Sequence, residues 1–236
     1  MHCLYYDRWM FFRGMGMSKN RANFLSYLFI VATVAIAAWL YPSLPDTMPS
    51  HWNVEGEVDG YLAKPWGVII LPGAAIFVFI VFRLIPVISP KGFKTGEFAD
   101  VLNIFQVVMV GFMSFVAILV MLEAQGIDVR INRMIFLAVG LLFIVIGSYL
   151  HRVRKNFFVG IRTPWTLASG EVWDRTHRLG GRLFIVMGLI FIAGAFYRVN
   201  TGLLVTMIVT IALVPVIYSY FLYRQVEGFE EDGKGA

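Results

Sequence analysis

Six long apolar segments constrain this chain more than any other feature of its sequence. A helix that crosses about 30 Å of hydrocarbon needs roughly 20 mostly apolar residues, since each residue advances it by about 1.5 Å. The segments predicted to span are residues 22–41, 68–89, 99–122, 134–150, 183–197 and 203–223. The fifth is the shortest, and we expect it to extend back through Gly180 and Gly181. The sequence therefore predicts an all-α integral membrane protein: a six-transmembrane helical bundle with an ordered extracellular loop and a cytoplasmic amphipathic segment.

The composition agrees with burial in lipid. Hydrophobic residues make up 58% of the chain and charged residues 15%, whereas a soluble domain is roughly half apolar and about a quarter charged. The net charge of +5 raises the possibility of nucleic acid binding. The basic residues lie between apolar runs, however, so the lipid bilayer is the expected partner and direct nucleic acid binding is not. Cys3 is the sole cysteine, which excludes an internal disulfide bond and a cysteine-based metal cluster.

The distribution of Lys and Arg predicts the orientation in the cell (plasma) membrane. If the six segments all span, 20 basic residues divide very unevenly between the two sides. One side holds only Lys64, Arg130, Arg133 and Arg198. Because basic loops stay in the cytoplasm, we expect both termini there, as an N-terminal segment of residues 1–21 and a tail of residues 224–236.

Two features of the N-terminal region admit more than one interpretation. Residues 24–34 resemble a signal-peptide core, and residues 35–37 a cleavage site of the Ala-x-Ala type. Apolar residues continue through Tyr41, which favours a retained span. The run Met-Ser-Lys-Asn-Arg at residues 17–21 also resembles a start, so residues 1–16 form either an upstream extension or an interfacial segment.

The first polar stretch, residues 42–65, is predicted to be an ordered outer loop. Its three prolines stiffen the chain, and the dipeptide Asp59-Gly60 predicts a tight turn. The loop is either a lid anchored at the interface by Trp52 and Tyr61 or an outward-facing ligand site. The polar side chains that such a site would use are Asp46, His51, Asn53, Glu55, Glu57 and Asp59.

A zinc enzyme is not predicted. His51 lies on the opposite side of the membrane from His151 and His177, so these residues cannot share a metal ion. The chain also contains neither a His-Glu-x-x-His helix nor a Cys-x-x-Cys pair. We therefore expect no metal, no cofactor and no catalytic centre.

The second polar stretch, residues 151–182, is predicted to lie in the cytoplasm. Ser169 can cap a helix on which Trp173 and His177 share one face. We expect Gly180 and Gly181 to loosen or kink the junction with the fifth span. Two interpretations remain open, namely an interfacial helix anchored to lipid and a docking site for a cytoplasmic partner.

The alternative function is a small multi-span transporter or permease. Prolines within the spans can interrupt helices, which is a feature of transporters. Ion pathways also need ionisable groups in the spans, but Arg83, Asp100 and Glu123 all lie near span ends. The sequence therefore favours a transporter less than a binding protein.

Two stretches resemble the motifs of one known family. Residues 44–53 read LPDTMPSHWN and are followed by Gly56, Asp59 and Lys64, which resembles the DUF1648 signature. Residues 156–167 read NFFVGIRTPWTL and are followed by Ser169, Trp173, Thr176 and His177, which resembles the SdpI signature. Together they resemble the SdpI family of toxin-immunity membrane proteins. On this basis residues 22–98 form a DUF1648-like region and residues 99–223 an SdpI-like region.

The resemblance implies a function. Characterised members of this family protect bacteria from a secreted, membrane-active killing peptide, and they signal by holding a cytoplasmic DNA-binding repressor at the membrane when toxin is present. The residues then expected to bind toxin or ligand in the outer loop are Asp46, His51, Asn53, Gly56 and Asp59. The residues expected to dock the partner are Asn156, Gly160, Arg162, Thr163, Pro164, Trp165, Trp173 and His177.

Overall fold

The computed structural model describes residues 16–53, 57–91, 95–197 and 200–229. Within these residues six helices are long and apolar enough to cross a membrane, which confirms the predicted all-α six-span fold. They are α1 (Lys19–Leu40), α2 (Lys64–Ile88), α3 (Ala99–Ala124), α4 (Ile131–Leu150), α6 (Gly170–Gly194) and α7 (Thr201–Val226). The shorter elements are η2 (Tyr41–Ser43), β1 (Thr47–Trp52), β2 (Val58–Ala63), η3 (Thr95–Phe98) and α5 (Pro164–Ala168).

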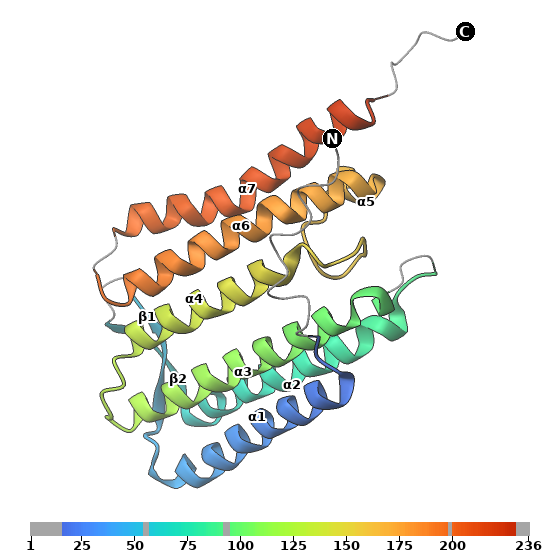
Figure 1. The fold of residues 1–236 in the computed structure, drawn as a ribbon. Coiled ribbons are helices and arrows are strands. Elements are labelled where there is room, and N and C mark those ends of the chain that lie inside the picture. The colour runs from blue at the N-terminus through green and yellow to red at the C-terminus, as the bar shows by residue number, and fades with distance from the viewer. Residues whose placement is uncertain (1–15, 54–56, 92–94, 198–199, 230–236) are drawn as a thin grey trace.

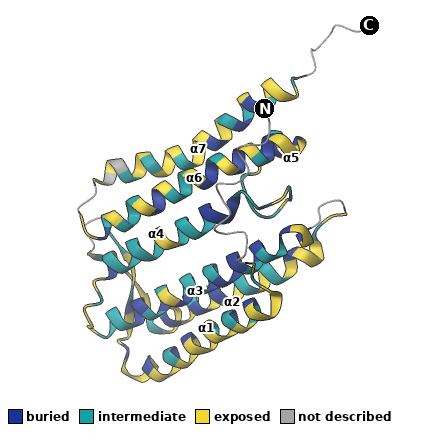
Figure 2. Ribbon diagram, viewed as in Figure 1, coloured by how far each residue is buried: buried dark blue, intermediate teal, exposed yellow. Residues whose placement is uncertain are grey.

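The spanning helices form two groups of three (Figure 1). In chain order, α1, α2 and α3 make one group, and α4, α6 and α7 make the other. Exposed residues colour much of the surface of α1, α2 and α7 in Figure 2. Many of them are large and apolar, including Phe77, Val87 and Phe221. Such a surface suits lipid rather than water, as a spanning bundle requires.

The helices α4 and α6 touch backbone to backbone. A Cβ atom added to Gly181 would lie 2.6 Å from the carbonyl oxygen of Gly147, and one on Gly188 would lie 2.6 Å from that of Gly140. Small residues allow this close approach, which is a main source of helix association in membranes. The fifth span extends back through Gly180 and Gly181, as the sequence predicted, because α6 runs from Gly170 to Gly194.

A buried core lies toward each end of the bundle. One contains Phe98, Val101, Tyr149 and Trp173, from η3, α3, α4 and α6. The other contains Leu40, Leu44, Met48, Val68, Met121 and Ile131. Between them, buried Gln106 on α3 donates a hydrogen bond to the hydroxyl of Ser26 on α1 at 3.0 Å. This polar link joins the two helices within the apolar layer.

The loop between α1 and α2 contains strands that the sequence analysis did not predict. Strands β1 and β2 pair antiparallel, with Thr47 opposite Ala63 and Pro49 opposite Tyr61. Asp59 and Gly60 lie within β2, so the prediction that they form the turn was wrong. The pairing is irregular around His51, where a Cβ atom on Gly60 would lie 2.9 Å from that of His51. This crowding gives Gly60 a packing role instead of a turning one.

The glycine contact generates a first prediction. We expect Gly181→Ala to destabilise the protein by about 1–3 kcal/mol, since the new methyl group must push two backbones apart. Unfolding of the purified protein in detergent, followed by tryptophan fluorescence, measures the effect.

Gly73→Ala is the matched control. Gly73 lies within α2, and a Cβ atom there meets nothing within 4 Å. Equal destabilisation by both substitutions would show that the α4–α6 contact has no special importance.

Candidate functional site

Polar residues gather at the two ends of the bundle. At one end stands the hairpin of β1 and β2, hereafter the hairpin. At the other end, residues 151–169 connect α4 to α6 and include α5, and they are called the signature loop.

The hairpin is held firmly at its base. Leu44 and Met48 are buried in the core at this end. A Cβ atom on Gly67 would lie 2.7 Å from that of Met48, so the first turns of α2 press directly on β1. Lys64 donates its backbone N–H to the carbonyl of Asp46 and its ammonium group to the carbonyl of Leu44, both at 2.8 Å. The hairpin is therefore a fixed part of the fold.

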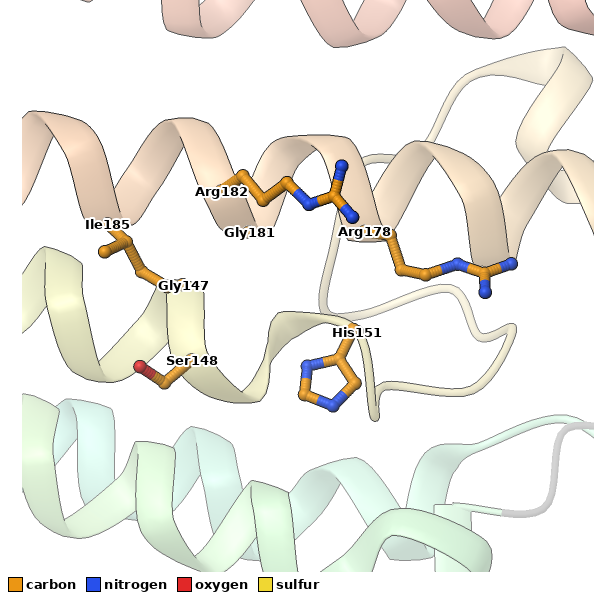
Figure 3. Close-up of a pocket in the computed structure, with 7 residues that line it drawn as sticks. All are labelled: Gly147, Ser148, His151, Arg178, Gly181, Arg182 and Ile185. Atoms are coloured by element: carbon orange, nitrogen blue, oxygen red, sulfur yellow. The ribbon is translucent and has the colours of Figure 1, made fainter. Parts of the chain in front are cut away.

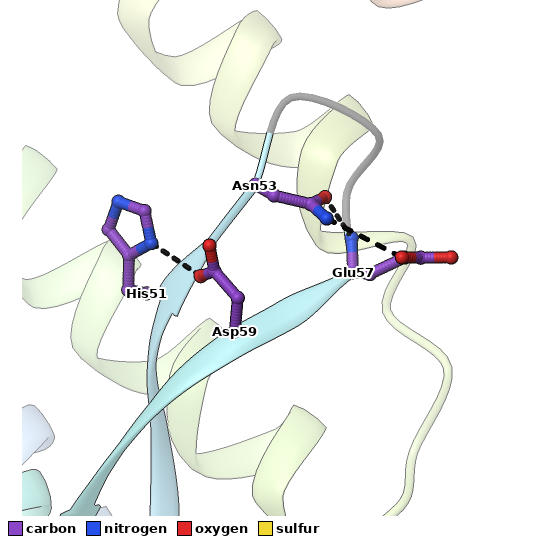
Figure 4. A network of polar contacts seen from close by, with 4 residues as sticks. All are labelled: His51, Asn53, Glu57 and Asp59. Carbon is purple, nitrogen blue, oxygen red and sulfur yellow. Dashed lines mark hydrogen bonds and ion pairs between the residues drawn. The ribbon is translucent and has the colours of Figure 1, made fainter.

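The exposed polar side chains of the hairpin form two pairs (Figure 4). Nδ1 of His51 lies 2.5 Å from Oδ1 of Asp59, and the two side chains are 71% and 44% exposed. The Oδ1 atom of Asn53 accepts the backbone N–H of Glu57 at 2.8 Å. These groups can accept and donate hydrogen bonds to a ligand from the hairpin surface.

Two other predicted hairpin residues do not join these pairs. Asp46 is exposed and lies before β1, where its carbonyl binds Lys64. Gly56 lies outside the described residues. Within the described ranges, no three His, Cys, Asp or Glu residues come close enough to hold a metal ion.

In the signature loop, Asn156 acts as an internal clamp. Its side chain is buried, yet each of its polar atoms makes two hydrogen bonds. Oδ1 accepts the backbone N–H groups of Phe158 and Val159, and Nδ2 donates to the carbonyls of Arg154 and Val159, at 2.7–3.0 Å. Since a buried polar group is costly unless bonded, this full satisfaction fixes the turn.

Trp173 and His177 bind the signature loop to α6. The indole Nε1 of Trp173 donates to the carbonyl of Val153 at 2.7 Å, and Nε2 of His177 accepts the N–H of Ile161 at 3.0 Å. Because Nε2 is an acceptor, the proton of the neutral ring must lie on Nδ1, which donates to the carbonyl of Trp173 at 2.8 Å. The two rings stack with centroids 4.0 Å apart. Both residues hold the loop in place.

Gly160 is required by this arrangement. Its φ of +114° lies in the region that favours glycine. A Cβ atom would also collide with Nε2 of His177. The backbone can therefore approach the imidazole only because residue 160 has no side chain.

Thr163 begins α5 with a capping box. Its hydroxyl accepts the N–H of Thr166, and the hydroxyl of Thr166 accepts the N–H of Thr163 in return. The Thr163 hydroxyl also lies 3.0 Å from that of Ser219 on α7, a residue that the sequence analysis missed. Trp165 packs edge-on against Tyr220, the next residue of α7, with ring centroids 5.1 Å apart. The signature loop is thus attached to α7 as well as to α6.

The signature loop exposes a different set of residues from those that hold it. Asn156, Thr163, Trp173 and His177 are buried and therefore do not themselves form a surface. Arg162 and Pro164 are exposed, Trp165 is half-buried, and Phe157 is 40% exposed. The guanidinium of Arg162 donates to the carbonyl of Phe157, which fixes a cation beside an aromatic residue at the surface.

Ion pairs surround the signature loop. Arg152 contacts Asp100 of α3, and Arg154 lies 3.7 Å from Asp174 of α6. Ser169 caps α6 by accepting the N–H of Val172, as the sequence predicted. The loop therefore contacts helices of both groups.

Comparison with known proteins finds a family match for the region that contains the hairpin and another for the region that contains the signature loop. Residues 152–219 match the SdpI/YfhL protein family, and residues 28–76 match a domain of unknown function, DUF1648. The chain is 26% identical over 211 residues to the Immunity protein SdpI of Bacillus subtilis (strain 168). The alignment covers 88% of this chain and 99% of that relative. No solved structure matches the chain.

The geometry of Gly160 supplies a second prediction. We expect Gly160→Ala to loosen the signature loop and to reduce stability by about 1–3 kcal/mol, through the strained φ and the collision with His177. Faster hydrogen–deuterium exchange at residues 154–163 reports the loosening.

Gly170→Ala serves as the comparison. Gly170 is the first residue of α6, and an added Cβ atom meets nothing within 4 Å. Unchanged exchange in the Gly160 variant would show that the His177 contact does not hold the loop.

Proposed function

Because the chain belongs to the SdpI family, we propose that it is a membrane immunity protein, which protects its cell against a secreted, membrane-active toxin. The observation that carries the proposal is the similarity to an immunity protein over nearly the whole length of both chains. The six-span fold supports it, since a protein already in the bilayer can meet a toxin that acts there.

The hairpin is the toxin-facing element in this proposal. It presents His51, Asn53 and Asp59 on a surface whose base is fixed by buried Met48. Tyr61 of β2 and Trp66 in the first turn of α2 are also exposed. Aromatic side chains favour the membrane interface, where an amphipathic peptide also accumulates. A toxin bound there would meet polar and aromatic groups together.

The proposed role is binding rather than catalysis. The imidazole of His177 has both nitrogens occupied by backbone groups, so it is not available as a general base. The other paired histidine, His51, contacts a carboxylate on an open surface, where water is not excluded. Protection through sequestering the toxin needs neither group to react.

The signature loop is the proposed docking surface for a cytoplasmic partner, a repressor by the family resemblance. Arg162, Pro164 and Trp165 supply the contact surface, with Phe157 beside them. Asn156, Gly160, Thr163, Trp173 and His177 contribute by holding the loop. Each residue expected to serve docking therefore either forms the contact surface or holds the loop that displays it.

A protection assay tests the proposed immunity. Bacillus subtilis cells that lack their own SdpI would express this chain and grow in medium from a toxin-secreting parent strain. We expect the chain to restore growth and His51→Ala or Asn53→Ala to remove that protection, because each loses a polar group of the hairpin surface.

Ser50→Ala is the control for this assay. Ser50 is an exposed neighbour on the same strand. Lack of protection by the unaltered, membrane-inserted chain would contradict the immunity proposal. Full protection by the His51 and Asn53 variants would show that these hairpin side chains are not needed for immunity.

Cysteine labelling tests the orientation on which both surfaces depend. With Cys3→Ser as background, single cysteines replace Ser50 in the hairpin and Ala168 at the end of α5, both exposed positions. A membrane-impermeant maleimide should label position 50 in intact cells and position 168 only after permeabilisation, since basic loops remain inside. Labelling of position 168 from outside would refute cytoplasmic docking.

A further inference from the structure

We propose that α4 and α6 form a binding site for the phosphate group of an anionic phospholipid, beside the signature loop. A small pocket lies between these helices where α4 ends. Ser148 and His151 line it from the α4 side, and Arg178 and Arg182 from α6 (Figure 3). This site is separate from the hairpin and from the exposed residues of the signature loop.

Among the described residues, no carboxylate neutralises the charge of the pocket. Arg152, Arg154 and Arg175 each have a carboxylate partner, namely Asp100, Asp174 and Glu171. Arg178 and Arg182 have no carboxylate within 4.0 Å among the described residues. On α6, Arg175 pairs with Glu171, whereas Arg178 and Arg182, which line the pocket, do not pair with a described carboxylate. Guanidinium groups bind phosphate through paired, charge-assisted hydrogen bonds, so an anion is the complementary ligand.

His151 experiences the same positive surroundings. Burial lowers the pKa of this histidine, and the charges of Arg152 and Arg178 lower it further. The lowered pKa favours the uncharged ring, so His151 adds little positive charge to the pocket. The cationic character of the pocket comes from the arginines.

The size of the pocket selects among ligands. Its volume is about 50 Å³. A single water needs roughly 10–15 Å³ by this measure, and drug-sized ligands need about 300–1,000 Å³. The space suits a group as small as a phosphate and excludes a peptide. The rest of the ligand must then lie outside the pocket.

An apolar surface leads from the pocket along both helices, and it identifies the ligand as a lipid. Val186 and Leu189 follow Arg182 by four and seven residues, on the same face of α6, and are 54% and 56% exposed. Leu141 precedes Ser148 by seven residues on α4 and is 56% exposed. Acyl chains can lie against these residues while the phosphate occupies the pocket. A free phosphate ion would make no use of them.

Ser148 adds a preference within the anionic lipids. Its hydroxyl donates to the carbonyl of Ile144 at 2.7 Å, so its oxygen can still accept a hydrogen bond. A head group that carries a hydroxyl next to its phosphate can donate to this oxygen. Phosphatidylglycerol has that chemistry and is the probe of choice.

Lipid retention tests the proposal. The full chain would be placed in nanodiscs of phosphatidylcholine with a minor fraction of phosphatidylglycerol, and native mass spectrometry would measure the lipid bound to the protein. We expect selective binding of phosphatidylglycerol. Arg178→Gln and Arg182→Gln should each weaken it about fivefold, and the double variant by about the product, because each basic residue near the membrane surface contributes comparably.

Arg175→Gln is the matched control, since Arg175 lies on the same helix but pairs with Glu171. Selective binding that survives in the double variant, or equal retention of phosphatidylcholine, would overturn the proposal. Displacement of phosphatidylglycerol by inorganic phosphate at submillimolar concentration would overturn the lipid assignment and leave an ion site. The single variants each keep one guanidinium, and a graded loss in them supports the site independently of the double variant's stability.

Discussion

The backbone contact between α4 and α6 determines where the signature loop lies. In a bilayer, apolar helix surfaces gain nothing by leaving lipid, so close packing must hold the helices together. Gly147 and Gly181 permit that packing because neither carries a Cβ atom. The signature loop begins where α4 ends, and its buried anchors Trp173 and His177 lie near the start of α6. Fixing the two helices against each other therefore fixes both supports of the loop.

The buried polar residues of the signature loop form their hydrogen bonds within the chain and not with a partner. Asn156 uses its entire side chain on neighbouring backbone groups, and His177 has both ring nitrogens bonded to the backbone. A group so fully satisfied gains little from a further contact and loses much if exposed unpaired. Recognition is left to the residues that this framework displays, above all Arg162, whose guanidinium is already held against the carbonyl of Phe157.

The sequence predicts the spans well because the length of an apolar run can be counted along consecutive residues. It predicts the Ser169 cap because capping depends on residues within one helical turn. The sequence does not predict the features that depend on contacts between residues far apart in the chain. Gly180 lies against Ile161 of the signature loop and Gly181 against the carbonyl of Gly147, and the sequence does not show that these glycines make such contacts. Asp59 and Gly60 have the composition of a turn, but the pairing of β1 with β2 places them in a strand. The bond between Thr163 and Ser219 joins residues 56 positions apart, so no local sequence pattern predicts it.

The two groups of helices offer a defined route between the hairpin and the signature loop. The pair α4–α6 is joined along its length, by the glycines and by the bond from Arg133 to the carbonyl of Ala195. The hairpin packs in a core with Val68 of α2, Met121 of α3 and Ile131 of α4, through Met48. At the far end α3 meets the loop directly, since Val101 shares a core with Val153 and Trp173, and Asp100 contacts Arg152. A displacement of α3 therefore acts on Val153, whose carbonyl binds the Trp173 indole. The ion pair between Asp100 and Arg152 therefore links α3 to the signature loop, and the bond from Trp173 to Val153 links α6 to it.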